Sequence, residues 1–239
     1  MFKKKPPIRF WSTCPGVKDC HPIIPATKLK RSIGACEHAT KQKHASKCPG
    51  IKLYGNLGFI LPMPCDLIIK TNGDMESVDW EAPTLLDSDS GFIGVHDGKQ
   101  AKSSAPPNSI NSVIKIGTTW RVSARKDIVF IQSPVLYNGE KRFTAATGLL
   151  DPSKVPQLNA QLYWHIKEGE TLIEAGTPLL QLTPILRDSI RSWDYVVEDA
   201  TAKDMRFENA INYSMDTKFK PDTPSVVRNN SKIIKNYYD

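Results

Sequence analysis

Residues 148–185 read GLLDPSKVPQLNAQLYWHIKEGETLIEAGTPLLQLTPI, and this stretch decides the fold. It contains a Gly-Leu-Leu-Asp-Pro corner, an extended segment that carries aromatic side chains, and a second extended segment that begins at Ile173. Leu179 to Ile185 is a short apolar run directly after a Gly-Thr-Pro turn, a pattern typical of a buried β-strand. The stretch therefore predicts a sheet to which the upstream chain adds further strands.

Short strand-like segments recur upstream, rich in β-branched and aromatic residues and separated by Gly, Pro and Asn. They are 8–12, two within 57–70, 78–80, 112–117, 119–124, 127–134 and 143–147. Asn72-Gly73 predicts a tight hairpin turn, because both residues tolerate positive φ. We expect roughly nine to eleven short strands between Ile8 and Ile185 with no long helix among them, and hence a mainly β barrel or sandwich.

After Ile185 the pattern becomes helical. The apolar residues Leu186, Ile190, Trp193 and Val197 recur at helical spacing. This predicts a helix from about Arg187 into the region 205–212, with an apolar stripe that packs on the β core or on a partner. Residues 218–239 are predicted to form an extended tail that is either disordered or ordered by a neighbouring molecule.

These patterns divide the chain of 239 residues into three parts. Residues 1–52 form a basic region with cysteines and histidines, 53–186 a β-rich core domain, and 187–239 the C-terminal helix and tail. No segment approaches the roughly 20 apolar residues that span a bilayer. The charged start lacks the apolar core of a secretory signal. We therefore expect no membrane contact, synthesis inside the cell and reduced cysteines.

The net charge of +7 is concentrated near the N-terminus. Residues 1–52 contain twelve Lys or Arg and two acidic residues, so they carry +10 and the rest of the chain carries −3. Such a region binds polyanions such as DNA, RNA or an acidic protein face, or it is only a solvated arm. The candidate polyanion-binding residues are Lys28, Lys30, Arg31, Lys41, Lys43 and Lys47.

The same region gathers thiol and imidazole side chains, which are the preferred tetrahedral ligands of zinc. The candidate ligands of a structural Zn²⁺ are Cys14, Cys20, Cys36 and Cys48, with His21 or His38 as substitutes. The sequence has no Cys-x2-Cys pair, so scattered reduced thiols and surface histidines are the alternative. Residues 32–47 are predicted to form a short basic helix.

Sequence signs of catalysis are scarce. His96 and Asp97 are adjacent, so in a strand they would point to opposite sides instead of forming an iron-binding triad with His165. A loop histidine is the interpretation we favour for His96. The sequence has no Gly-x-Ser-x-Gly, no Walker loop and no Gly-x-Gly-x-x-Gly, so the motifs that most directly indicate an enzyme are missing.

Residues 148–185 resemble the C-terminal half of dUTPase and dCTP deaminase domains. In that family a Gly-x-Ile-Asp corner precedes a strand, and an Ile-x-x-Gly-x-x-x-Ala-Gln-Leu strand closes a β-clip sheet. The points of agreement are Gly148, Asp151, Gly176 and Gln181, and together with residues 119–126 the match covers about 70 residues. The resemblance implies a β-clip-like (dUTPase-like) fold that forms oligomers by sharing strands. It also implies that residues 119–126 occupy the place of the family's phosphate-binding segment.

The whole chain is similar to a family of proteins of unknown function carried by tailed bacteriophages, particularly of the marine type. A Lys-Cys-Pro stretch, a Trp-containing middle and a Gly-Thr-Pro-Leu-x-Gln strand recur there in this order. This resemblance implies a viral protein, located in the host cytoplasm during infection or in the virion.

The sequence departs from the dUTPase pattern where catalysis would occur. Asp151 is the candidate for the aspartate that activates water, yet Pro-Ser-Lys-Val-Pro follows it in place of the Tyr-x-Gly-Glu that shapes the nucleotide pocket. No Gly/Ser-rich C-terminal phosphate lid is present. A deaminase would need a glutamate base after the same corner, and the nearby Glu168 and Glu170 are predicted to lie in a turn.

Three functions remain open. The one we favour is a non-enzymatic bacteriophage protein, a structural, assembly or decoration component of the virion that binds itself or other phage structural proteins. The first alternative is a nucleotide-binding or nucleotide-hydrolysing enzyme. The second is a nucleic-acid or host-protein binder that uses the basic N-terminal region.

Overall fold

The structure is a computed structural model that describes residues 7–32, 48–83, 91–97, 99, 105–190, 194–217 and 224–237. The chain divides into two compact units, Met1–Arg191 and Ser192–Asp239. We call the first the β body and the second the C-terminal unit, and each is described by itself.

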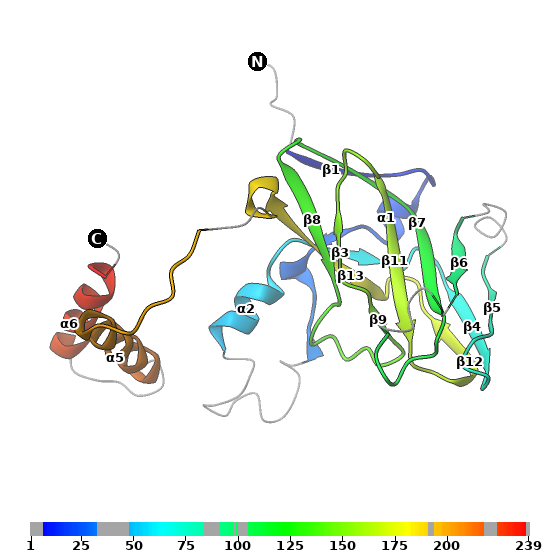
Figure 1. Cartoon of the computed structure of the whole chain (residues 1–239). Coiled ribbons are helices and arrows are strands. Elements are labelled where there is room, and N and C mark those ends of the chain that lie inside the picture. The colour runs from blue at the N-terminus through cyan, green and yellow to red at the C-terminus, as the bar shows by residue number, and fades with distance from the viewer. Residues whose placement is uncertain are drawn as a thin grey trace, which may run out of the picture. The chain divides into compact units, whose positions relative to one another are not determined.

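Thirteen strands are described in the β body (Figure 1). In chain order they are β1 (Ile8–Ser12), β2 (Ile24–Pro25), β3 (Phe59–Pro62), β4 (Leu67–Asn72), β5 (Val78–Glu81), β6 (Ile93–His96), β7 (Val113–Ala124), β8 (Ile128–Ser133), β9 (Phe143–Ala145), β10 (Gly148–Leu150), β11 (Gln157–Trp164), β12 (Glu168–Ile173) and β13 (Pro178–Leu186). The described helices of this unit are short: α1 (Val17–Cys20), η1 (Ala26–Lys28), α2 (Pro49–Gly55) and η5 (Arg187–Ile190). The strands outnumber our expectation because β2, β6, β10 and β12 do not correspond to predicted strands, and β2 and β10 have only two and three residues.

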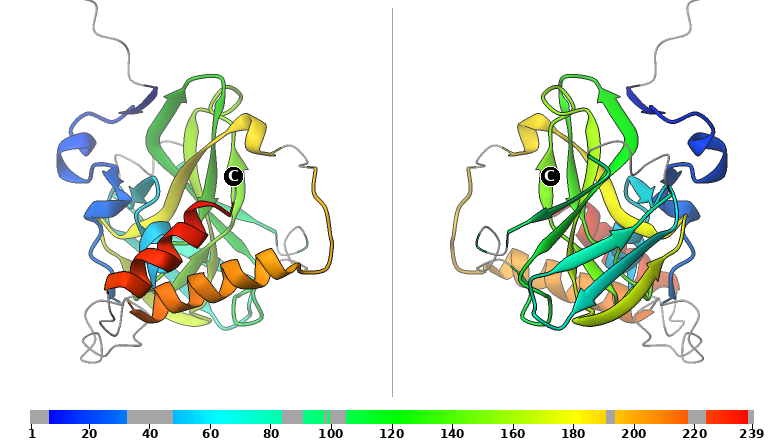
Figure 2. Two further views of the ribbon diagram at one scale, coloured as in Figure 1. Left: turned by 90° about the vertical axis from the view of Figure 1, so that its left-hand side faces the viewer. Right: turned by 90° about the vertical axis from the view of Figure 1, so that its right-hand side faces the viewer.

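The strands form three antiparallel sheets. The first has the order β1-β7-β11-β9, with β6 also paired to β7; the second has the order β10-β8-β13-β3-β2; the third has the order β12-β4-β5. Figures 1 and 2 show the strands of the third sheet side by side on one flank of the β body. The basic region 1–52 contributes to these sheets, because β1 pairs with β7 and β2 with β3. The prediction of a mainly β protein is confirmed.

Alternation along the strands builds the core. In β11 the buried residues are Leu158, Ala160, Leu162 and Trp164, and the residues between them are more exposed. This is the pattern of a strand with one face on the core. In β13, residues 179–182 are all buried, which confirms the buried strand predicted after the Gly-Thr-Pro turn.

The hairpin predicted at Asn72-Gly73 is present, but its loop is longer than a two-residue turn. β4 ends at Asn72 and β5 begins only at Val78, and the residues with positive φ are Gly73 and Met75. Asp74 closes this loop, because its Oδ1 accepts hydrogen bonds from the backbone N–H groups of residues 76 and 77 at 2.8 and 2.7 Å. A side-chain carboxylate therefore shapes the turn.

Two further strand predictions need correction. The segments 112–117 and 119–124 form one strand, β7, instead of two. Gly117 does not end a strand; a Cβ there would lie 2.0 Å from the carbonyl oxygen of Gly91, so the glycine permits close backbone contact. Glu168 and Glu170, predicted to lie in a turn, belong to β12, which pairs with β4 along its whole length.

The predicted helix from Arg187 is wrong in its first half. η5 ends at Ile190, residues 194–200 are not helical, and α5 (Ala202–Thr217) begins at Ala202. The reason is a reciprocal cap: Thr201 N donates to Asp204 Oδ2 at 2.6 Å, and Asp204 N donates to Thr201 Oγ1 at 3.3 Å. This arrangement satisfies N–H groups at the start of a helix and fixes where it begins.

The tail predicted for residues 218–239 contains a helix. α6 (Pro224–Lys235) packs beside α5, as Figures 1 and 2 show. The rings of Phe207 and Tyr237 stack with centroids 3.8 Å apart, so Tyr237 contacts this chain itself. No helix within the described ranges is long and apolar enough to cross a membrane.

Candidate functional site

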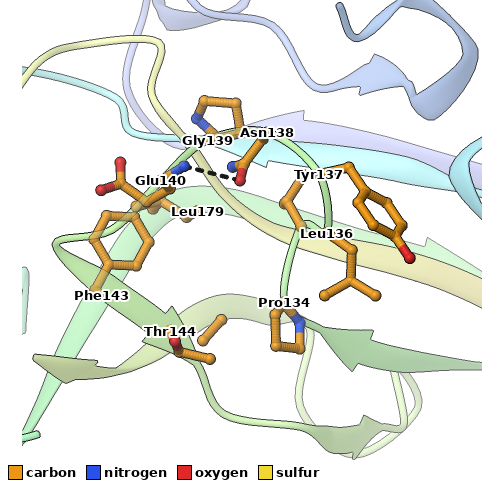
Figure 3. Close-up of a pocket in the computed structure, with 12 residues that line it drawn as sticks. Pro134, Leu136, Tyr137, Asn138, Gly139, Glu140, Phe143, Thr144 and Leu179 are labelled. Carbon is orange, nitrogen blue, oxygen red and sulfur yellow. Dashed lines mark hydrogen bonds between the residues drawn. The ribbon is translucent and has the colours of Figure 1, made fainter. Parts of the chain in front are cut away.

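A cavity of about 240 Å³ opens in the β body beside the loop 134–140. In Figure 3, Pro134 and Leu136 lie on one side of it and Phe143 and Leu179 on the other. The loop turns sharply because residues 137 and 139 have positive φ values of 62° and 81°. The Asn138 side-chain oxygen accepts a hydrogen bond from the residue 140 backbone N–H at 3.2 Å, which fixes this wall of the cavity.

Glu140 supplies the charged edge of the cavity. Its Oε1 accepts hydrogen bonds from Arg142 N and Nε at 2.8 and 2.9 Å, and its Oε2 accepts one from Arg142 Nη2 at 2.6 Å. Burial would raise the pKa of Glu140, but the hydrogen bonds from Arg142 outweigh it and hold that pKa below its usual range. The carboxylate is thus ionised and already bound within the chain.

Thr144 links the cavity to a histidine. Its hydroxyl lies 2.8 Å from Nε2 of His165. Burial lowers the pKa of His165, although the charge of Glu140 opposes this, so the imidazole is neutral at pH 7. The Nδ1 atom of His165 is buried and has no hydrogen-bond partner among the residues that the structure describes.

The chemistry available at the cavity is limited. Most of the described residues that line it are apolar, and its carboxylate is paired with an arginine of the same chain. The arrangement is suited to hold a small apolar group. Its lining hydroxyl of Thr144 lies beside the imidazole of His165, which does not itself line the cavity.

Asp151 lies after β10, outside the set of residues that line the cavity. Arg187 binds both of its oxygens, with Nη1 to Oδ2 and Nη2 to Oδ1 at 2.9 Å each. Ser153 adds hydrogen bonds from its hydroxyl and its backbone N–H at 2.6 and 3.0 Å. The hydrogen bonds from Arg187 and then Ser153 hold the pKa of Asp151 well below its usual range. This is the environment of a structural ion pair, whereas a general base needs a free, poised carboxylate.

The other residues suggested by the dUTPase resemblance are also engaged elsewhere. Glu170 forms an ion pair with Lys70 at 3.1 Å, and Glu168 is exposed on β12. In the segment 119–126, Arg121 donates to the backbone carbonyls of residues 118 and 120, and Arg125 pairs with Asp127 at 2.7 Å. The structure therefore does not assemble these residues around one ligand.

The basic candidates divide into three groups. Lys28 and Lys30 are exposed and remain candidates for polyanion binding. Arg31 is used for hydrogen bonds within the chain, because it donates to the carbonyls of Leu136 at 2.6 Å and Gly55 at 2.7 Å. Burial lowers the pKa of Arg31. The last three, Lys41, Lys43 and Lys47, lie outside the described residues, as does most of the predicted basic helix.

The zinc prediction depends on residues beyond the described ranges, namely Cys36 and His38. The described candidates Cys14, Cys20 and Cys48 have free thiols; they lie after β1, at the end of α1 and before α2. Within the described ranges, no group of three or more His, Cys, Asp or Glu side chains is arranged to hold a metal ion. The structural Zn²⁺ stays a prediction.

His96 and Asp97 are not joined in a site with His165. Asp97 accepts a hydrogen bond from the backbone N–H of Lys99 at 2.9 Å, while His165 contacts Thr144.

Sequence reasoning missed Glu140, Arg142 and Arg187. The Glu-Lys-Arg sequence at 140–142 could have indicated the pairing of Glu140 with Arg142, because the two charges are close in the chain. The pairing of Arg187 with Asp151 depends on the fold.

No protein-family model matches this chain, and no curated protein matches it. Among solved structures, the chain is similar to the native EIAV dUTPase, with 10% identity, coverage of 81% of this chain and 99% of that chain, and a TM-score of 0.37. It is also similar to a mutant dUTPase from phage phi11 of S. aureus, with 12% identity, coverage of 71% and 94%, and a TM-score of 0.34. Both likenesses are low, so nothing about the activity of this chain follows from them.

Proposed function

We propose that this chain is a non-enzymatic bacteriophage protein that acts as a structural, assembly or decoration component of the virion. In this role the β body is the scaffold, and the connecting segment (residues 194–200) binds a second copy of the chain. The phage assignment rests on the resemblance of the sequence to the phage family. The binding role rests on one structural observation, the exposed apolar side chains of the connecting segment.

The connecting segment exposes three consecutive apolar side chains. Tyr195, Val196 and Val197 are 86%, 74% and 86% exposed, and neither a helix nor a strand includes them. A single exposed apolar residue is common. Three in a row with high β-propensity, outside the described helices and strands, are instead typical of a peptide that adds to the edge of a sheet.

The β body has a sheet edge with exposed apolar side chains, as the connecting segment does. β10 is the outer strand of its sheet. Its Leu149 is 51% exposed and lies directly opposite Ile131 of β8, which is 36% exposed. A strand added beside β10 would pair with its outer backbone groups and extend this apolar pair. We therefore assign the edge to the connecting segment of another copy, which makes the protein a homo-oligomer.

The pairing of the candidate catalytic carboxylates with arginines supports a non-enzymatic role. Asp151 is bound by Arg187 through both oxygens, and Glu140 is bound by Arg142. An enzyme built on either carboxylate would first have to break a charge-assisted pair.

The proposal predicts that Tyr195→Ser/Val197→Ser weakens self-association by on the order of 100-fold. Both side chains lie on the same side of an extended segment, and burial of each contributes about 1.5 kcal/mol. Sedimentation velocity over a range of concentrations measures the effect: the wild type sediments as an oligomer and the double variant as a monomer.

Leu53→Ser is the matched control, since Leu53 of α2 is a comparably exposed apolar residue at 69%. It should leave the oligomer unchanged. A wild type that is monomeric at every concentration, or a double variant that sediments like the wild type, would refute the role of the connecting segment.

A further inference from the structure

The C-terminal unit contains a second cavity, of about 330 Å³, between α5 and α6. The residues that line it are Lys203, Arg206, Lys232, Ile233, Asn236 and Tyr237. Half of them are cations and none is acidic. Two of the cations come from α5 and one from α6, so the pairing of the helices gathers charges that lie far apart in the sequence.

These three cations have no ion-pair partner within the part of the chain that the structure describes. The carboxylate closest in sequence, that of Asp204, is bonded to one lining residue and offsets part of the charge of Lys203: its Oδ2 accepts hydrogen bonds from Thr201, and its Oδ1 accepts one from the Tyr237 hydroxyl. These bonds lower the pKa of Asp204 to about 2. Like charges around one cavity repel each other, and a bound anion would relieve that repulsion.

Two of the cations are positioned before any ligand binds. The Lys203 ammonium lies 5.3 Å from the centroid of the Tyr237 ring, and that ring is itself held by its stack on Phe207. Arg206 Nε donates to the Ala202 carbonyl at 3.1 Å, which leaves the two terminal guanidinium nitrogens for a ligand. Preorganised donors bind more tightly, because less side-chain freedom is lost on binding.

We propose that this cavity binds a phosphate group of a nucleic-acid backbone. A guanidinium, two ammonium groups and the Asn236 amide provide the donors that phosphate oxygens accept. Ile233 and the Tyr237 ring give apolar surface for the attached sugar. The site is made of other residues than the basic N-terminal region, and it does not depend on the assembly role, which uses the connecting segment and β10.

The test is fluorescence anisotropy with the full chain and a fluorescein-labelled single-stranded oligothymidylate at several NaCl concentrations. Arg206→Gln/Lys232→Gln should lower the affinity at least about tenfold at low salt. It should also reduce the slope of log K against log[NaCl] by about 1.4, since each phosphate contact on a single strand contributes about 0.7. Inorganic phosphate should compete with the oligonucleotide for the wild type.

Lys154→Gln/Lys167→Gln is the matched control, because it removes the same charge at two exposed lysines of the β body. It should leave the affinity and the salt slope unchanged. Far-UV circular dichroism establishes that the helices of each variant are intact. The proposal is overturned if the folded Arg206/Lys232 variant binds the oligonucleotide like the wild type, or if the control loses as much affinity. Loss of inorganic phosphate binding alone, with oligonucleotide binding unchanged, would indicate a site for free phosphate and would also overturn it.

Discussion

Replacing Gly58 with alanine is expected to destabilise the β body by at least about 3 kcal/mol. Gly58 has a φ of +68°, and a Cβ there would lie 1.9 Å from the carbonyl oxygen of Leu182. The left-handed conformation alone costs a residue with a Cβ about 1–2 kcal/mol. The clash adds to this, because Leu182 belongs to the buried strand β13 and its backbone cannot move aside without disturbing the core.

Urea denaturation followed by tryptophan fluorescence measures this effect, with Gly148→Ala as the control. Gly148 is exposed in β10 of the same sheet, and apart from Gly148 and its two chain neighbours no atom of the described residues lies within 4 Å of the position of its Cβ. That control should keep nearly the wild-type midpoint. If Gly58→Ala unfolds at the same urea concentration as Gly148→Ala, the backbone at Gly58 does not lie as close to β13 as the structure has it.

The next largest loss, about 3 kcal/mol, is expected for Gln181→Met. Gln181 is fully buried. Its Nε2 donates to the carbonyls of Tyr54 at 3.1 Å and Leu57 at 2.9 Å, and its Oε1 accepts from Arg31 at 3.1 Å. Methionine keeps nearly the same volume but makes none of these bonds. The Leu57 carbonyl and the Arg31 guanidinium then each lose a partner, and the Tyr54 carbonyl keeps only the Leu57 N–H. Of the side-chain bonds between α2 and the sheet, that of the Tyr54 hydroxyl to Ser133 remains.

Gln161→Met is the matched control for this substitution, since Gln161 is exposed on β11. Its free energy of unfolding should stay within about 0.5 kcal/mol of the wild type. A loss of less than about 1 kcal/mol for Gln181→Met would mean that the buried amide does not hold α2 in place.

The sequence predicted the features that depend on local pattern. The apolar run at 179–185 became the buried strand β13, and Ile8–Ser12 became β1, because alternation and flanking turn residues act over a few positions. Gln181 is one of the positions at which the sequence resembles the dUTPase pattern. Its role could not be read from the sequence, since its partners Arg31, Tyr54 and Leu57 lie more than a hundred residues away.

Other features were missed for two different reasons. The start of α5 has a local sequence signal, because Thr201 and Asp204 have the spacing of a capping box, but the apolar spacing upstream predicts an earlier start. The cation cluster of the C-terminal unit was not readable, because it requires Arg206 and Lys232 to meet through the pairing of two helices. Likewise, only the fold shows that Arg187 neutralises the proposed catalytic Asp151.

Quantitative mass spectrometry of gradient-purified phage particles tests the assignment to the virion most directly. The number of copies of this chain is measured against that of the major capsid protein. The proposed structural or decoration role predicts a fixed ratio that is reproduced in independent particle preparations. If the chain is absent from the particles but abundant in infected cells, it is not a virion component.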